Sequence, residues 1–151
     1  MGVPMIQIQI YGNPFPWTAA RVCKNGHHYD PKSKEKEALR WQIKGQYRDP
    51  PVSGPVHIDI TFYMPIPKST SAAQRRQMRC GKILHVKKPD TSNLFKAYED
   101  ALKGIVIDDD NRSQRISACK VYSETPGALI RVRPLTPYGT LEDYYDAVDQ
   151  L

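Results

Sequence analysis

The amino-acid sequence predicts an α+β domain with a mixed β-sheet of about four or five strands and two main helices. Two stretches alternate apolar and polar residues in the way that half-buried strands do, residues 5–11 and residues 56–64. A third stretch, from Leu94 to Ile105, repeats its apolar residues at helical spacing. The length of 151 residues suits a single domain.

Weaker signals indicate the elements between these segments. Residues 17–32 contain an Asn-Gly turn and predict a surface loop or a hairpin. Residues 33–47 predict a helix of mixed charge, whose apolar stripe consists of Leu39, Ile43 and Tyr47. A short helix is expected to begin after Ser71 and to end at Gly81.

The last part of the chain predicts two further strands and a tail. Residues 116–122 and 128–133 are separated by a short turn, so we expect them to pair as a hairpin. Residues 134–151 hold four acidic residues and no lysine or arginine, and their apolar residues predict a short amphipathic helix. The chain is therefore divided into a domain at residues 1–133 and an acidic tail at residues 134–151.

Charge is unevenly distributed along the chain. Lysine and arginine number 22 against 16 acidic residues, which gives a net charge of +6. Outside the tail the same 22 basic residues face 12 acidic ones, so the rest of the chain carries +10. Such a body suits a polyanionic partner, because phosphates that it neutralises release counterions.

The basic residues gather in one region, where residues 68–88 contain seven cations and no acid. This region leads directly into the helix that begins near Leu94, so it is placed to guide a nucleic-acid backbone toward that helix. We assign binding of this backbone to six of its residues, Lys68, Arg75, Arg76, Arg79, Lys87 and Lys88.

The composition also bears on the compartment. No apolar run approaches the roughly 20 residues that a membrane-spanning helix needs, and the first residues do not resemble a signal peptide. Three cysteines without paired spacing suit a reducing compartment better than a disulfide scaffold. We expect a cytoplasmic protein without a membrane partner.

The stretch from Lys87 to Lys96 predicts a loop that enters a helix. Pro89 disfavours helical backbone in the residue before it, so the helix should begin after Pro89. Asp90 then lies at the N-terminus of the helix. Ser92 and Lys96 are four residues apart and share one helix face.

Three consecutive aspartates, residues 108–110, follow a short apolar segment after this helix. Adjacent carboxylates repel one another, so such a run is usually exposed or bound to cations. Carboxylate oxygens are hard ligands suited to Mg²⁺ or Mn²⁺. We expect a metal site that joins Asp90 to the end of the run, with Lys96 beside it. In the alternative, Asp90 is only a helix cap, the run is a solvated turn and Lys96 is a surface lysine.

The strings KPDTSNLFK, YEDALKGIVIDDD and KVYSETP closely resemble the RusA family of Holliday junction resolvases. The resemblance extends over roughly residues 5–133 and implies the fold of that family. On this resemblance Asp90 matches the first catalytic aspartate and Lys96 the catalytic lysine. The count to Lys120 places Asp110 at the last catalytic aspartate.

The resemblance leaves two points open within these motifs. The assignment in the acidic run is uncertain by one residue, so that Asp109 is a second candidate metal ligand and Asp108 a nearby alternative. Ser92 stands where the type member of the family has another aspartate, which removes one carboxylate from the expected metal site.

The resemblance implies a Mg²⁺-dependent endodeoxyribonuclease, with Mn²⁺ as the alternative ion, that resolves four-way DNA junctions as a homodimer. Two other functions are weighed against it. The absence of a carboxylate at Ser92 suggests a junction-binding protein with weak or no nuclease activity. The charge also fits a basic structural or RNA-binding protein, but that class does not explain the spacing of Asp90, Lys96 and Asp110.

Overall fold

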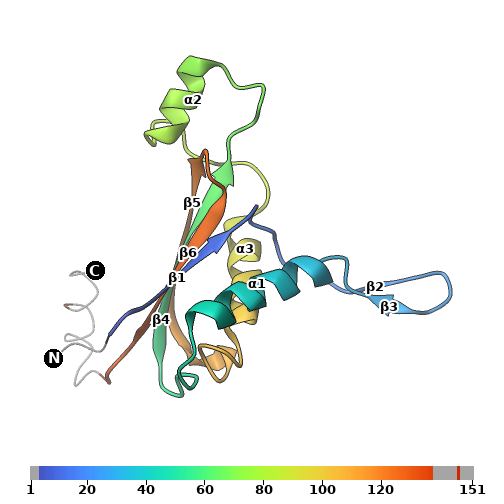
Figure 1. Cartoon of the computed structure of the whole chain (residues 1–151), viewed down its shortest axis with the longest axis vertical. Coiled ribbons are helices and arrows are strands. Elements are labelled where there is room, and N and C mark those ends of the chain that lie inside the picture. Colours follow the sequence, from blue (N-terminus) through green and yellow to red (C-terminus); the bar gives the residue numbers. More distant parts are fainter. Residues whose placement is uncertain (1–3, 138–145, 147–151) are drawn as a thin grey trace.

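A four-stranded mixed sheet forms the centre of the computed structural model, which describes residues 4–137 and residue 146 (Figure 1). Its strands lie in the order β1-β6-β4-β5. Strand β4 runs parallel to β5 and antiparallel to β6, and β6 runs antiparallel to β1. The strand bounds are β1 Ile6–Tyr11, β4 Val56–Pro65, β5 Ser113–Ser123 and β6 Gly127–Pro134.

Two helices, α1 (Ser33–Gln46) and α3 (Thr91–Leu102), bury their apolar residues in one core with the sheet. The short helix α2 (Ala72–Arg79) stands beyond one end of the sheet, and the hairpin of β2 (Arg21–Val22) and β3 (His28–Tyr29) extends away from the body (Figure 1). The predicted α+β class is therefore confirmed, as are the three helices predicted before residue 106 and the early hairpin.

Alternation along β4 places every second side chain in the core. These residues are no more than 4% exposed: Val56, Ile58, Ile60, Phe62 and Met64. Tyr98 of α3 packs edge-on against Phe62, with ring centroids 5.0 Å apart. Burial raises the pKa of Tyr98 to about 12. The core thereby fixes the rotation of α3 about its axis and leaves the opposite helix face free for polar residues.

The outer edge of β1 is covered by two glutamines of α1. The Tyr11 N–H donates to Gln42 Oε1 over 2.9 Å, and Gln42 Nε2 donates to the Tyr11 carbonyl over 2.9 Å. Gln46 makes the same pair of bonds with Gln9, at 2.9 and 2.7 Å. An unpaired strand edge invites pairing with another chain, so these amides satisfy the edge of the sheet from within.

The prediction that residues 116–122 and 128–133 pair with each other as a hairpin is wrong. Both segments are strands, but β4 lies between β5 and β6 and pairs with each of them. The three residues between β5 and β6 therefore cross over the end of β4 instead of joining neighbours. The physical reason is burial. In the middle of the sheet, β4, which is the most apolar strand, has a hydrogen-bonded neighbour on both edges and its apolar face is covered by the core.

The amphipathic helix predicted in the tail, with Leu141, Tyr144, Tyr145 and Val148 as its apolar stripe, lies outside the described residues. The division of the chain after residue 133 stays a prediction.

No helix in the part of the chain that the structure describes is both long enough and apolar enough to span a membrane.

Candidate active site at the two ends of helix α3

Asp90 precedes the first residue of α3 and has extended backbone, with φ −67° and ψ 141°. Its carbonyl accepts the first helical bond from the Leu94 N–H over 3.0 Å. Its carboxylate makes no capping bond to the helix N–H groups, although an aspartate at this position commonly does. The carboxylate is exposed and is free to meet a ligand, which argues against a purely capping role.

Lys120 of β5 holds the loop that carries Asp90. Its ammonium group donates to the carbonyls of Lys87 and Pro89, over 2.6 and 2.9 Å. Both carbonyls belong to residues within three positions of Asp90, so these hydrogen bonds connect the N-terminus of α3 to the sheet. Nothing in the sequence marks this role, because a lysine in a strand gives no sign of its distant acceptors.

Asp90 lines an open cleft with a volume of about 490 Å³. Lys32 and Lys88 also line it, so the carboxylate shares the cleft with two ammonium groups. The remaining walls are Pro14, Phe15, Pro16, Trp17, Pro89 and Asn93. A cleft of this kind suits an anionic group that approaches Asp90 under the attraction of the lysines.

Lys96 lies over the indole ring of Trp17, with its Nζ atom 3.7 Å from the ring centroid. A cation on an aromatic face is attracted by the negative face of the ring and keeps its charge. Trp17 is fixed in turn because its backbone N–H donates to the Asn93 carbonyl over 2.9 Å. Phe15 packs on Tyr98 with ring centroids 5.4 Å apart, which anchors the same loop to α3. Trp17 was not predicted from the sequence, since its contact with Lys96 spans most of the domain.

The acidic run lies at the other end of α3. Asp109 and Asp110 both approach Lys103, the residue that follows the helix, with Nζ to carboxylate distances of 3.6 and 3.8 Å. Asp108 instead pairs with Arg112, whose Nε donates to its carboxylate over 2.7 Å. Asp108 therefore has a guanidinium partner of its own, whereas Asp109 and Asp110 share the ammonium group of Lys103.

The electrostatics at this end reflect several close carboxylates. The pKa of Asp109 lies below its ordinary value, first because the Asp110 side chain is within hydrogen-bonding reach and then because the Asn111 N–H donates to it. The pKa of Glu99 is raised, first by burial, and the charges of Asp110 and Asp100 also raise it. The Lys103 ammonium group is the cation that forms ion pairs with both Asp109 and Asp110.

The two ends of α3 are too far apart for one metal ion. A helix of 12 residues is about 18 Å long, whereas Mg²⁺ holds its oxygen ligands at about 2.1 Å. Within the described residues, no group of three or more His, Cys, Asp or Glu side chains is arranged to hold a metal. Asp90 and Asp110 therefore stand near opposite ends of one helix, and the metal site expected to join them stays a prediction that one chain by itself does not fit.

The basic region divides into exposed and paired cations. Arg75 is engaged within the chain, because it donates to the Glu124 carboxylate over 2.9 Å and to the Pro67 carbonyl over 3.1 Å. The other five predicted DNA-binding residues are exposed, with side chains available to a partner: Lys68, Arg76, Arg79, Lys87 and Lys88. Ser92 is exposed as well, in the first turn of α3.

The domain is thus α+β, and the Asp90 carboxylate stands beside the exposed cations Lys87 and Lys88. The family described as Endodeoxyribonuclease RusA matches residues 12–133. A relative from Bacillus subtilis (strain 168), the uncharacterized protein YqaN, is 30% identical over 138 residues, which cover 87% of this chain and 97% of the relative. The chain belongs to the RusA family of endodeoxyribonucleases.

Proposed function

We propose that the protein is a metal-dependent endodeoxyribonuclease that resolves four-way DNA junctions by paired phosphodiester hydrolysis. Family membership supports the nuclease class. The observation that carries the proposal for this chain is the cleft at the start of α3, which the uncapped carboxylate of Asp90 shares with Lys32 and Lys88. That arrangement suits a phosphate backbone drawn in by lysines toward a carboxylate.

The residues around the cleft have separate tasks in this proposal. Lys32 and Lys88 draw the backbone toward Asp90, and the exposed cations of the basic region, Arg76 and Arg79 among them, hold the arms of the junction. Lys96 neutralises the negative charge that develops on the phosphoryl oxygens in the transition state. Trp17 is a positioning residue, because its ring restricts the ammonium group of Lys96.

Mg²⁺ remains the proposed cofactor, with Mn²⁺ as the alternative. A bound divalent ion supplies charge stabilisation to phosphoryl transfer. Since the carboxylates at the two ends of α3 cannot meet within one chain, the separation supports a site shared by two chains. Asp90 would come from one protomer, and the pair Asp109 and Asp110 from its partner.

A two-fold homodimer is the economical form of this proposal. Pairing the Asp90 end of one chain with the Asp110 end of the other generates two equal sites, because a two-fold axis repeats every contact. Two sites are what a junction with two-fold symmetry requires for two symmetric cuts. The cytoplasmic location stays a prediction that accompanies this function.

A cleavage assay on matched four-way and linear DNA, with and without Mg²⁺, tests the proposal. We expect paired cuts in the four-way substrate that require the metal, with much slower cleavage of the linear duplex. Equal cleavage of both substrates would remove the junction selectivity, and cleavage in the presence of a chelator would remove the metal requirement.

The exposed Ser92 favours a second candidate, a junction-binding protein with weak or no nuclease activity. A serine hydroxyl is a poorer ligand for a hard cation than a carboxylate. Tight junction binding without metal-dependent cleavage at any Mg²⁺ or Mn²⁺ concentration would select this candidate over the nuclease.

A further inference from the structure

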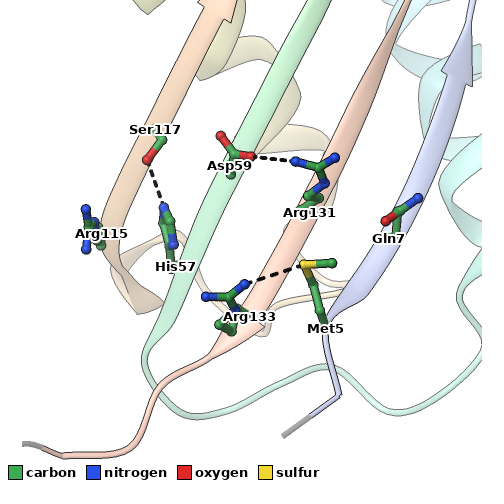
Figure 2. A pocket seen from close by; sticks show the side chains of 8 residues that line it. All are labelled: Met5, Gln7, His57, Asp59, Arg115, Ser117, Arg131 and Arg133. Atoms are coloured by element: carbon green, nitrogen blue, oxygen red, sulfur yellow. Dashed lines mark hydrogen bonds and ion pairs between the residues drawn. The ribbon is translucent and has the colours of Figure 1, made fainter. Parts of the chain in front are cut away.

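The face of the sheet opposite α1 and α3 carries no helix within the described ranges 4–137 and 146 (Figure 1). It is formed by the residues of β4, β5 and β6 that alternate with the core positions. A sheet face without a covering layer is normally polar and of mixed charge. Here three arginines, Arg115, Arg131 and Arg133, gather on one half of the face around a pocket of about 380 Å³ (Figure 2).

The pocket has an excess of positive charge. Its three guanidinium groups face one carboxylate, that of Asp59, so its formal charge is +2 when His57 is neutral. Arg131 approaches Asp59 at 3.5 Å, which is a long ion pair, and its Nε atom is buried without a hydrogen-bond partner. The pocket therefore leaves a buried guanidinium donor unsatisfied, at a cost in free energy.

The other two arginines, Arg115 and Arg133, form no ion pair within the described residues, although Asp59 lines the same pocket. The polar contact of Arg133 is to the sulfur of Met5, at 3.9 Å, and Arg115 lies beside His57 (Figure 2). No acidic side chain of the described residues lies within ion-pair distance of either arginine. The three guanidinium groups of the pocket outnumber its one carboxylate, so their mutual repulsion is only partly offset.

His57 and Ser117 complete the pocket with neutral hydrogen-bonding groups. His57 is only 9% exposed, and its Nε2 lies 2.8 Å from the Ser117 hydroxyl. Burial lowers the pKa of His57, and the charges of Arg115 and Arg133 lower it further, against the opposing charge of Asp59. The imidazole is therefore neutral near pH 7 and adds no charge of its own.

We propose that this pocket binds a phosphate group. A guanidinium presents paired N–H donors that match the oxygens of a phosphate. A phosphate dianion would also cancel the charge of +2 on the pocket. The site is separate from the cleft of Asp90, because the pocket residues of β4 alternate with those that face the helices. The phosphate comes either from a nucleic-acid backbone or from a small phosphorylated molecule.

Nuclear magnetic resonance of the His57 imidazole provides a readout that does not require cleavage. We expect inorganic phosphate to raise the pKa of His57, since a bound anion offsets the repulsion from Arg115 and Arg133. Chloride at equal ionic strength serves as the control anion and should have little effect. An equal response to phosphate and chloride would overturn the proposal.

Two charge-matched double variants locate the site. Arg115→Gln with Arg133→Gln should weaken phosphate binding by roughly tenfold for each arginine removed. Lys44→Gln with Arg48→Gln removes the same charge at the exposed end of α1 and should leave binding unchanged. Equal affinity in both double variants would overturn the proposal. Asp59→Asn should tighten binding, because it removes the competing carboxylate, and weaker binding there would also contradict it.

Duplex DNA in place of inorganic phosphate identifies the source of the phosphate. If DNA shifts the His57 resonance and the Arg115/Arg133 variant weakens DNA binding, the ligand is the nucleic-acid backbone. If phosphate shifts the resonance and DNA does not, the ligand is a small phosphorylated molecule. If neither does, the pocket is no phosphate site. Because binding alone is measured, a failure of the proposed nuclease function would leave this result unchanged.

Discussion

The two ends of helix α3 both carry aspartates, yet they differ in how the chain balances the charge. At the start of the helix, Asp90 is uncapped and exposed, in a cleft that it shares with two lysines. At the far end, Asp109 and Asp110 lie against Lys103 and their side chains interact with each other. The first end therefore combines one carboxylate with two ammonium groups, whereas the second gathers two carboxylates around one ammonium group. In the proposed function the two ends complement each other, and a second chain is needed to bring them together.

The largest effect is expected from removing one charge at either end. Asp90→Asn and Asp110→Asn should each abolish cleavage while junction binding changes little, or tightens slightly because phosphate is repelled less. Single-turnover cleavage and a binding titration measure the two effects. Glu37→Gln is the control, since Glu37 is exposed on α1 and belongs to neither group. Full activity in either variant would remove that aspartate from the mechanism.

Mixing the two inactive variants distinguishes a shared site from two separate ones. If each site takes Asp90 from one chain and Asp110 from the other, a heterodimer of Asp90→Asn and Asp110→Asn chains contains one intact site. Equal mixing makes about half of the dimers heterodimers, so about one quarter of the wild-type sites should return. The rate of nicking of a junction measures this recovery. A mixture as inactive as its components would mean that the site does not combine these ends.

The Lys96 ammonium group belongs to the first end, and its removal should reduce the rate more than the affinity. Lys96→Ala should lower turnover of bound junction by roughly 10²-fold, as the loss of one positioned transition-state donor does. Trp17→Leu should lower turnover less, and should add nothing in a chain that already lacks Lys96. Rates at saturating protein measure both effects. If junction affinity fell and the turnover of bound DNA did not, Lys96 would be an anchor for phosphate only.

The smallest expected effect is on the salt dependence of junction binding, and it distinguishes exposed cations of the basic region from a lysine that is already ion-paired. Replacing Arg76 and Arg79 by alanine should weaken binding to all junction sequences alike and flatten the salt dependence by up to about 0.9 log units for each phosphate that the variant no longer neutralises. Lys103→Ala should leave that slope unchanged, because Lys103 is already ion-paired with Asp109 and Asp110. Junction affinity over a range of salt concentrations measures the slopes. An equal change in both variants would mean that DNA binds at the far end of α3 as well.

Local sequence patterns predicted the secondary structure correctly where it depends on neighbouring residues. Alternation along β1 and β4 and the apolar spacing of α3 predicted those elements, because the periods of strand and helix are properties of adjacent residues. The same patterns failed for the pairing of β5 and β6. Their short connection resembles a hairpin turn, but the choice of partner depends on the burial of β4, a strand that lies far from both in the sequence.

The candidate site residues likewise divide into features that the sequence predicted and contacts that it did not. The sequence determined that Asp90 opens a helix, that Lys96 lies on the helix face of Ser92, and that a cationic loop precedes them. It did not show that Trp17 restrains Lys96, that Lys120 holds the Asp90 loop, or that Arg75 is occupied by Glu124. These contacts join residues far apart in the chain, and residue types alone do not specify them.

By itself, then, the sequence determined the secondary structure, the family and the inventory of charged groups. Only the tertiary structure decided that Asp90 and Asp110 stand at opposite ends of α3 and that three arginines share a pocket on the sheet face opposite α1 and α3. The reason is physical. Spacing along one helix or strand sets which face a side chain occupies, but the distance between two elements depends on how the whole core packs.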